Sequence, residues 1–442
     1  MAYTRANALL GNARWTDALQ AYNAALEAAI DAGDTELAAR AGLNASWYTG
    51  WMGDFASGER TARRTFENSN GADPVTRARI MAQIAGHGAI ARLDDSGLDR
   101  QMAEAVAIGP ADNATHGANM DLARCWIDAQ FARCDAAIAA GSRALPIFAS
   151  PRSRQAYLEV AGHRHNAMLY AGAWEIRDAE QEELFAMASE SGNVGAILNI
   201  DVGRIVTECA RAGDWAALES RCRATLDTWK GVGPWAQLMQ GVAGVAQLQR
   251  GDIGGGRATC EAARKAFPRN AWAGFIEGAE LLCAAYDDGP AWEDRLAEFA
   301  SFAAPTLSTM TIGRALYVTV LARTYHVRGR RAELAGWYPV LSELVGRGFR
   351  CIAFEMVDSV AGLAATAAGN WAVAEHHFER AIALAERIGQ RFVLPVARQA
   401  YAEMLIARST AGDADRASVL LGRAMDEYRS MGMTLMLDRV RR

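Results

Sequence analysis

The sequence predicts an all-α fold, an α-solenoid in which about eleven antiparallel helix pairs form a right-handed superhelix. A Gly-(Asp/Asn)-(Trp/Phe) turn returns about every 40 residues, and a fixed period of this length indicates repeated helical pairs. Ala, Leu, Glu and Arg dominate, whereas the alternation of β-branched residues that is typical of strands is missing. No Pro/Ser-rich linker interrupts the 442 residues, so we expect one domain spanning residues 1–442.

The repeated turn is clearest at three places, Gly53-Asp54-Phe55, Gly213-Asp214-Trp215 and Gly369-Asn370-Trp371. Looser copies contain Trp15 and Trp174. In such a turn the glycine can end one helix in the left-handed conformation, because it has no Cβ to clash. The following Asp or Asn can accept hydrogen bonds from the free N–H groups of the next helix. We expect the aromatic residue to pack between the two helices and to fix their crossing.

Weaker copies of the turn complete the series. Ile253 and Trp292 occupy the aromatic position with less regular flanks. Interpolation predicts hidden copies near Ser96-Gly97-Leu98, between Phe131 and Cys134, at Gly329-Arg330-Arg331 and at Gly412-Asp413-Ala414. The Gly-rich run that starts at Gly251 follows no strand and falls in register with the repeat. It is therefore predicted to be an inter-helix turn rather than a phosphate-binding loop.

The helix after each turn is predicted from the spacing of its apolar residues. Trp371, Ala374, Phe378 and Ala381 follow one another at intervals of three, four and three, which places them on one helical stripe. Gly362 lies seven residues before the turn glycine, where a small residue lets the first helix approach closely.

This stripe resembles the second helix of a tetratricopeptide repeat, and the small residue of the first helix agrees with that family. The period is longer than the usual one of about 34 residues, and the proline that ends each repeat is mostly missing. These departures are similar to the superhelical modules at the C-termini of bacterial LuxR-type ATP-binding regulators and of ATPase-linked class III nucleotide cyclases. The region from Gly369 to Met433 resembles those modules most.

The resemblance implies an inner groove lined by first-helix positions about 13, 10, 6, 3 and 2 residues before each turn glycine. Glu159 lies at the first of these positions in the unit whose turn glycine is Gly172. The candidate ligand-binding residues carried over in this way are Arg40, Trp47, Trp51, Asn166, Tyr170, Arg211, Arg323 and His326.

Trp47 and Trp51 are the most distinctive of these residues. They lie four apart on one helix face, so together they can offer a flat aromatic platform for a peptide side chain or a ring-shaped ligand. The alternative is that both pack between neighbouring repeats. Trp126 and Trp235 lie on other first helices, whose phase the pattern leaves open.

Composition and motifs exclude several classes of function. The net charge of −5 gives no broad basic surface for nucleic acid, and no apolar stretch is long enough to span a bilayer. The chain has no Walker loop and no His-Glu-x-x-His motif, so we expect no catalytic residue, metal or cofactor. Seven cysteines without CxxC pairs are typical of free thiols in a reducing cytosol, and the Ala- and Arg-rich composition suggests a cytoplasmic bacterial protein.

We therefore expect a non-enzymatic module of a bacterial signalling or transcription regulator, either a C-terminal piece or a free-standing relative. It would bind a partner domain, a peptide segment or a small effector in its concave groove. One alternative is an enzyme or small-molecule-binding protein whose enclosed pocket contains Tyr170, Arg323 and His326. Another is a scaffold that forms a homodimer through its C-terminal repeat, where apolar residues from Met425 to Leu437 have nothing after them to cover them.

Overall fold

The chain is helical almost throughout. A computed structural model describes residues 1–11, 14–192, 194–228, 233–267, 273–287, 289–352 and 354–441. The prediction of an all-α fold is confirmed. Among the described residues, strand structure is confined to β1 (Cys351–Ile352) and β2 (Glu355–Met356), which pair as an antiparallel hairpin.

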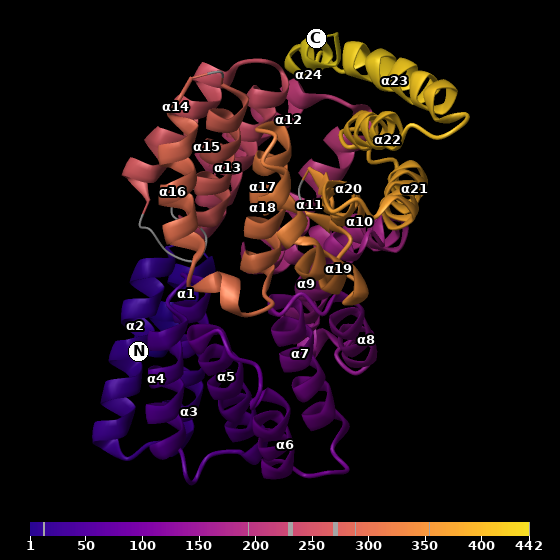
Figure 1. Cartoon of the computed structure of the whole chain (residues 1–442). Coiled ribbons are helices and arrows are strands. Elements are labelled where there is room, and N and C mark those ends of the chain that lie inside the picture. The colour runs from indigo at the N-terminus through magenta and orange to yellow at the C-terminus, as the bar shows by residue number, and fades with distance from the viewer. Residues whose placement is uncertain are drawn as a thin grey trace.

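The helices follow one another along the chain from the N-terminus, at the lower left of Figure 1, to the C-terminus at the top. The first group consists of α1 (Ala2–Gly11), α2 (Trp15–Ala32), α3 (Thr35–Trp51), α4 (Phe55–Glu67), α5 (Pro74–Arg92), α6 (Leu98–Ile108), α7 (Ala114–Gln130) and α8 (Cys134–Ala144). The middle group consists of η1 (Pro151–Ser153), α9 (Arg154–Ala171), α10 (Trp174–Ser191), α11 (Val194–Ala212), α12 (Trp215–Thr228), α13 (Gly233–Gln249), α14 (Ile253–Ala266), α15 (Gly274–Tyr286) and α16 (Trp292–Ala303). The last group consists of η3 (Thr306–Ser308), α17 (Ile312–Val327), α18 (Arg331–Gly336), α19 (Tyr338–Gly346), α20 (Val357–Ala367), α21 (Trp371–Ile388), α22 (Leu394–Arg408), α23 (Asp413–Ser430) and α24 (Thr434–Arg441).

The marked aromatic residues each begin a helix, as the turn chemistry predicts. Trp15, Phe55, Trp174, Trp215, Trp292 and Trp371 are the first residues of α2, α4, α10, α12, α16 and α21. Gly53 and Gly213 have φ angles of 92° and 70°, in the left-handed region. The carboxylate of Asp54 accepts a hydrogen bond from the amide of Ser57 at 3.0 Å, which caps the first turn of α4.

The interpolated copies of the turn also coincide with helix starts. The four copies lie at the starts of α6, α8, α18 and α23, which begin at Leu98, Cys134, Arg331 and Asp413. In two of them the left-handed residue is not glycine: Leu93 has a φ of 51° and Ala132 a φ of 55°. The Gly-rich run is a turn, as predicted, because Gly251 has a φ of 92° and the Asp252 side chain caps α14. A non-glycine residue in the left-handed position therefore hides a repeat from a search for glycines.

Paired helices approach closely because small residues face large ones. An added Cβ on Gly362 would lie 2.8 Å from the ring of Phe378, and one on Gly244 would lie 2.7 Å from the Cys260 sulfur. Ala374, Phe378 and Ala381 of the predicted stripe are fully buried. The seven cysteines are buried as free thiols.

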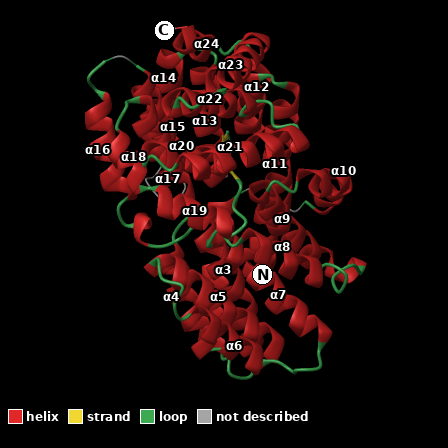
Figure 2. Cartoon of the chain, turned by 45° about the vertical axis from the view of Figure 1, so that its right-hand side comes forward, coloured by secondary structure: helices red, strands yellow, loops and turns green. Residues whose placement is uncertain are grey.

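The C-terminal helices pack back against the middle of the chain. The amide of Arg350 donates to the carbonyl of Tyr170 at 2.8 Å, and the amide of Arg391 donates to the carbonyl of Ala210 at 3.2 Å. The Thr434 hydroxyl donates to the carbonyl of Arg250 at 3.1 Å. Figures 1 and 2 both place α23 and α24 beside α12. The ends of α9, α11 and α13 are thus covered by residues that follow them by about 180 positions, which is a long-range contact in any fold.

This arrangement corrects the expectation of an uncovered apolar C-terminus. Tyr428, Met431, Met433, Met436 and Leu437 are all buried within the chain. An added Cβ on Gly213 would lie 3.0 Å from Met431, so the end of α11 lies directly under that side chain. The apolar surface that seemed free in the sequence is covered by earlier helices.

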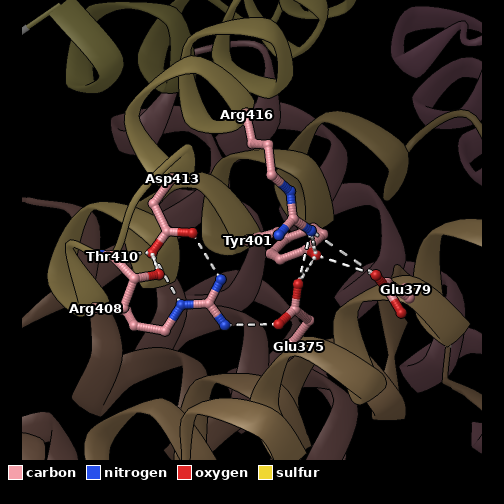
Figure 3. Close-up of polar contacts among 7 residues, drawn as sticks. All are labelled: Glu375, Glu379, Tyr401, Arg408, Thr410, Asp413 and Arg416. Carbon is pink, nitrogen blue, oxygen red and sulfur yellow. Dashed lines mark hydrogen bonds and ion pairs between the residues drawn. The ribbon is translucent and has the colours of Figure 1, made fainter.

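A polar network joins α21, α22 and α23 (Figure 3). The Glu375 carboxylate accepts hydrogen bonds from Arg408 at 2.6 Å, from Arg416 at 2.6 Å and from the Tyr401 hydroxyl at 2.8 Å. Arg408 also makes a two-pronged pair with Asp413, at 2.9 and 2.7 Å, at the turn into α23. Burial opposes ionisation of Glu375, but these donors hold its pKa at about 2.

We expect Glu375→Gln to lower the free energy of unfolding at pH 7 by about 1–3 kcal/mol, because the amide removes the charged acceptor that Arg408 and Arg416 share. Since the folded pKa is depressed, this stabilisation is present above pH 4.5 and is lost as the pH falls toward 2. Urea unfolding of the parent and the variant at pH 7 and pH 3 measures the difference. The exposed neighbour provides the control Glu379→Gln, and an equal loss at both pH values would contradict this role of Glu375.

Candidate functional site

A cavity of about 590 Å³ lies between the N-terminal helices and the middle of the chain. Its walls come from α1, α2, α3, α5, α7, α9 and α11, so residues from position 3 to position 199 meet around it. This volume is within the range of about 300–1,000 Å³ that is typical of small-molecule sites.

One wall of the cavity is aromatic. Trp47 and Trp51 lie edge-to-face with their ring centroids 6.2 Å apart, and Trp51 lies 6.1 Å from Trp15 in the same manner. Both tryptophans of α3 are partly exposed, and both also pack on other helices, Trp47 against Trp126 at 5.0 Å and Trp51 against Trp235 at 6.1 Å. The sequence left open whether these two side chains face a binding site or pack between helices. In the structure they do both, because they line a cavity and also contact other helices.

The opposite wall carries polar and charged groups. Arg79 of α5 and Glu159 of α9 both line the cavity, together with the buried amide of Asn119. Burial raises the pKa of Glu159 above its usual value, and the positive charge of Arg79 partly offsets this effect. His163 packs against Trp47 at 5.7 Å, and burial lowers its pKa to about 4. The histidine is therefore neutral at pH 7, so the charges on this wall belong to Arg79 and Glu159.

Four predicted residues lie in or next to this cavity. Trp47 and Trp51 line it. Arg40 lies at its edge, with its guanidinium 5.1 Å from the ring centre of Tyr3, a lining residue. Asn166 donates to the side-chain oxygen of Asn199, another lining residue, at 2.7 Å.

Three predicted residues of the middle units instead contact the C-terminal part of the chain. The ring of Tyr170 stacks on Phe349 with centroids 5.1 Å apart. Arg211 donates to the carbonyl of Ile388 at 3.2 Å. Arg323 forms a two-pronged pair with Glu355, at 2.8 and 2.6 Å, and is buried. Groove positions in this part of the fold are occupied by the chain itself.

Arg323 also lines a second cavity, of about 200 Å³, together with the predicted His326. His326 Nε2 lies 3.3 Å from the carboxylate of Glu403. Burial opposes ionisation of Glu403, but His326 lowers its pKa below the usual value. Two of the lining side chains contact carboxylates, Arg323 that of Glu355 and His326 that of Glu403, whereas Arg439, which also lines the cavity, donates to the carbonyl of Val327 at 3.2 Å.

Sequence reasoning missed Arg79 and Asn119 because their repeats lack a turn glycine. Asn119 lies thirteen residues before the left-handed Ala132, and Arg79 lies fourteen before the left-handed Leu93. Trp126 lies six residues before Ala132, as Trp47 lies six before Gly53, and these two rings touch. Asn119 lies fifteen residues before Cys134, the start of α8, as Arg40 lies fifteen before Phe55, the start of α4, so counting back from the helix start could have found Asn119.

Models of known protein families and the curated proteins both give no match to this chain. The tetratricopeptide-like resemblance therefore continues to rest on the repeated turn and on the helical stripe. Within the described ranges, no cluster of three or more His, Cys, Asp or Glu side chains is arranged to hold a metal ion. In the same part of the chain, none of the helices has the length and apolarity needed to cross a membrane.

We expect the stability of the protein to fall as the pH is lowered from about 6.5 to 4, because His163 is neutral when folded and charges on unfolding. The depressed pKa means that its contribution is complete above pH 6.5 and is lost on acidification toward its folded pKa. One such proton lowers the free energy of unfolding by about 1.4 kcal/mol for each pH unit. His163→Gln should therefore flatten the pH profile measured by urea unfolding. An imidazole resonance of His163 that titrates near 6.5 in the folded protein would contradict this environment.

Proposed function

We propose that this chain is a non-enzymatic recognition protein of the tetratricopeptide-like class, which binds a small effector or a peptide segment in its N-terminal cavity. In this proposal about eleven helix pairs form one right-handed α-solenoid over residues 1–442. The protein would act in the cytoplasm as part of a bacterial signalling or transcription regulator. The observation that carries the proposal is the aromatic-walled cavity of about 590 Å³.

The chemistry of the lining supports a binding role. Ligand sites are mainly apolar, with a few polar groups that orient the ligand. Here the wall that includes Trp47 and Trp51 faces amides and charged side chains of α5, α7 and α9. Aromatic rings provide a large contact area at a small cost in side-chain entropy. A ligand seated among these rings would displace water from both walls at once.

The position of the cavity supports a mechanism for signalling. Its walls belong to helices far apart in the chain, so a bound ligand would contact α3 on one side and α9 and α11 on the other. A ligand that binds one curvature of the chain more tightly shifts the population toward that curvature. A partner domain, such as an ATPase or a cyclase, could read the change.

The second candidate is an enzyme that uses the cavity of about 200 Å³ around Arg323 and His326. The observation in its favour is the close approach of His326 and Glu403, a pair of groups suited to proton transfer. Against it, Arg323 is already neutralised by Glu355, and the cavity is about a third as large as the first. The homodimer alternative loses the exposed apolar surface that motivated it, since Tyr428 and Met433 are fully buried.

We expect Trp51→Ala to weaken ligand binding by at least about tenfold, or 1.4 kcal/mol, because it removes one face of the aromatic wall. Intrinsic tryptophan fluorescence of the full chain, titrated with a library of soluble metabolites and short peptides, identifies binders and measures their affinity. Circular dichroism confirms that the variant is folded.

The matched control is His326→Ala, which alters the other cavity. If the binders lose affinity with His326→Ala and keep it with Trp51→Ala, the site is misassigned and the second candidate is supported. If binding is unaffected by both variants, neither cavity is the site.

A further inference from the structure

The N-terminal cavity holds two opposite charges that do not pair with each other. Arg79 and Glu159 line the cavity of about 590 Å³, and both also line an adjoining space of about 30 Å³. The positive charge of Arg79 acts on Glu159, yet no ion pair joins them within the part of the chain that the structure describes. Glu159 is hydrogen-bonded to the Gln155 side chain, and the Arg79 guanidinium makes no hydrogen bond to a described residue. Two charges that face one space without contact leave room for a ligand between them.

Further polar atoms around the same space lack partners. The side-chain oxygen of Gln83, a residue only 8% exposed, lines the smaller space and accepts no hydrogen bond from a described residue. The indole N–H of Trp15, a residue 2% exposed, lines the larger cavity and likewise donates to no described atom.

The distribution of these groups indicates the charge pattern of the ligand. A lone acid would pair with Arg79 and leave the Glu159 carboxylate without a cationic partner, and a lone amine would do the reverse. Arg152, the other charged side chain on the lining, is exposed. His163 carries no charge at pH 7 because burial lowers its pKa to about 4. A molecule with one positive and one negative group matches the interior of the cavity.

We propose that the cavity binds a zwitterionic small molecule of the amino-acid class. Its carboxylate pairs with Arg79, its ammonium group pairs with Glu159, and its aromatic or aliphatic body lies against Trp47 and Trp51. Guanidinium–carboxylate pairs are strong because both partners are charged and two hydrogen bonds can form in parallel. The ammonium group gains from the carboxylate and from the nearby ring faces. This inference rests on the proposed function, for which it names the class of effector.

The test compares ligands that differ in one charged group. Isothermal titration of the full chain uses L-phenylalanine, phenethylamine, which lacks the carboxylate, and 3-phenylpropionate, which lacks the ammonium group. L-Leucine and L-tryptophan extend the zwitterionic set to other side chains. We expect at least one zwitterion to bind about tenfold or more tightly than either singly charged analogue, since each analogue leaves one charged side chain of the cavity without an oppositely charged partner.

The two charge-removing variants give a crossed pattern that a merely destabilised protein would not show. Arg79→Gln should weaken binding of the zwitterion and of 3-phenylpropionate by about tenfold and leave phenethylamine nearly unchanged. Glu159→Gln should weaken the zwitterion and phenethylamine and leave 3-phenylpropionate nearly unchanged. The matched control is Arg152→Gln, at the exposed edge of the cavity, which should change affinity little.

Three results would overturn the inference: equal affinity for the zwitterion and the analogues, insensitivity of zwitterion binding to both variants, or no binding of any zwitterion up to about 10 mM. Failure of the proposed function is distinguishable from these. If the fluorescence library yields uncharged or singly charged binders that depend on Trp51, the cavity is a binding site and only the ligand class is wrong. If neither the library nor the amino acids bind in a Trp51-dependent manner, both proposals fail.

Discussion

The architecture of the middle and C-terminal parts depends on one set of contacts, the hydrogen bonds to backbone carbonyls that hold the C-terminal segments against the ends of earlier helices. Arg350, Arg391 and Thr434 reach the ends of α9, α11 and α13 in the same order as they occur in the chain. Because the order matches, successive C-terminal segments pack against the ends of successive helices in the middle of the chain. The bonds from Arg350 and Arg391 join backbone groups and do not depend on the side chains at those positions, whereas the third requires the Thr434 hydroxyl. It also decides which surfaces remain free, because the inward-facing side chains of the middle units meet residues 349–355 and 388 rather than solvent.

The C-terminal segments do not cover the inward-facing side chains of the N-terminal helices, and a cavity remains there. Tyr170, Arg211 and Arg323 have partners within the chain, whereas Trp47 and Trp51 keep exposed surface toward the cavity. Where the C-terminal part of the chain buries a charged side chain, a nearby side chain of opposite charge pairs with it, as Glu355 does with Arg323. Arg79 and Glu159 face each other without such a pair. Both side chains are partly exposed, and Glu159 has the Gln155 side chain as a hydrogen-bond partner but no cation of a described residue within ion-pair distance, so a cationic group of a ligand would supply the missing charge partner.

Local chemistry determined what could be predicted from the sequence. The turns at Gly53, Gly213 and Gly369 were readable because a left-handed residue favours glycine and the next helix needs a cap. The turns around Leu93 and Ala132 could be placed only by interpolation, and the groove positions counted from Ala132, including Asn119, were lost with them. The return of the C-terminal helices could not be predicted at all, because a repeat specifies contacts between neighbours. In solenoid folds in general, the small rotation at each junction, summed over many units, decides which distant units meet.

Helices α9 and α11 each run from the cavity to the contacts with the C-terminal part of the chain. Glu159 lies in the cavity, and Tyr170, eleven residues later on the same helix, accepts the hydrogen bond from Arg350. Asn199 and Arg211 stand in the same relation on α11, where Arg211 bonds to Ile388. A helix of this length is a rigid rod of about 16 Å between the two sites, since each residue adds about 1.5 Å. A ligand that draws Glu159 toward Arg79 must therefore either tilt α9 or strain its contact with the hairpin. The same two helices that form one wall of the cavity thus carry any change there to the C-terminal helices, without a separate relay.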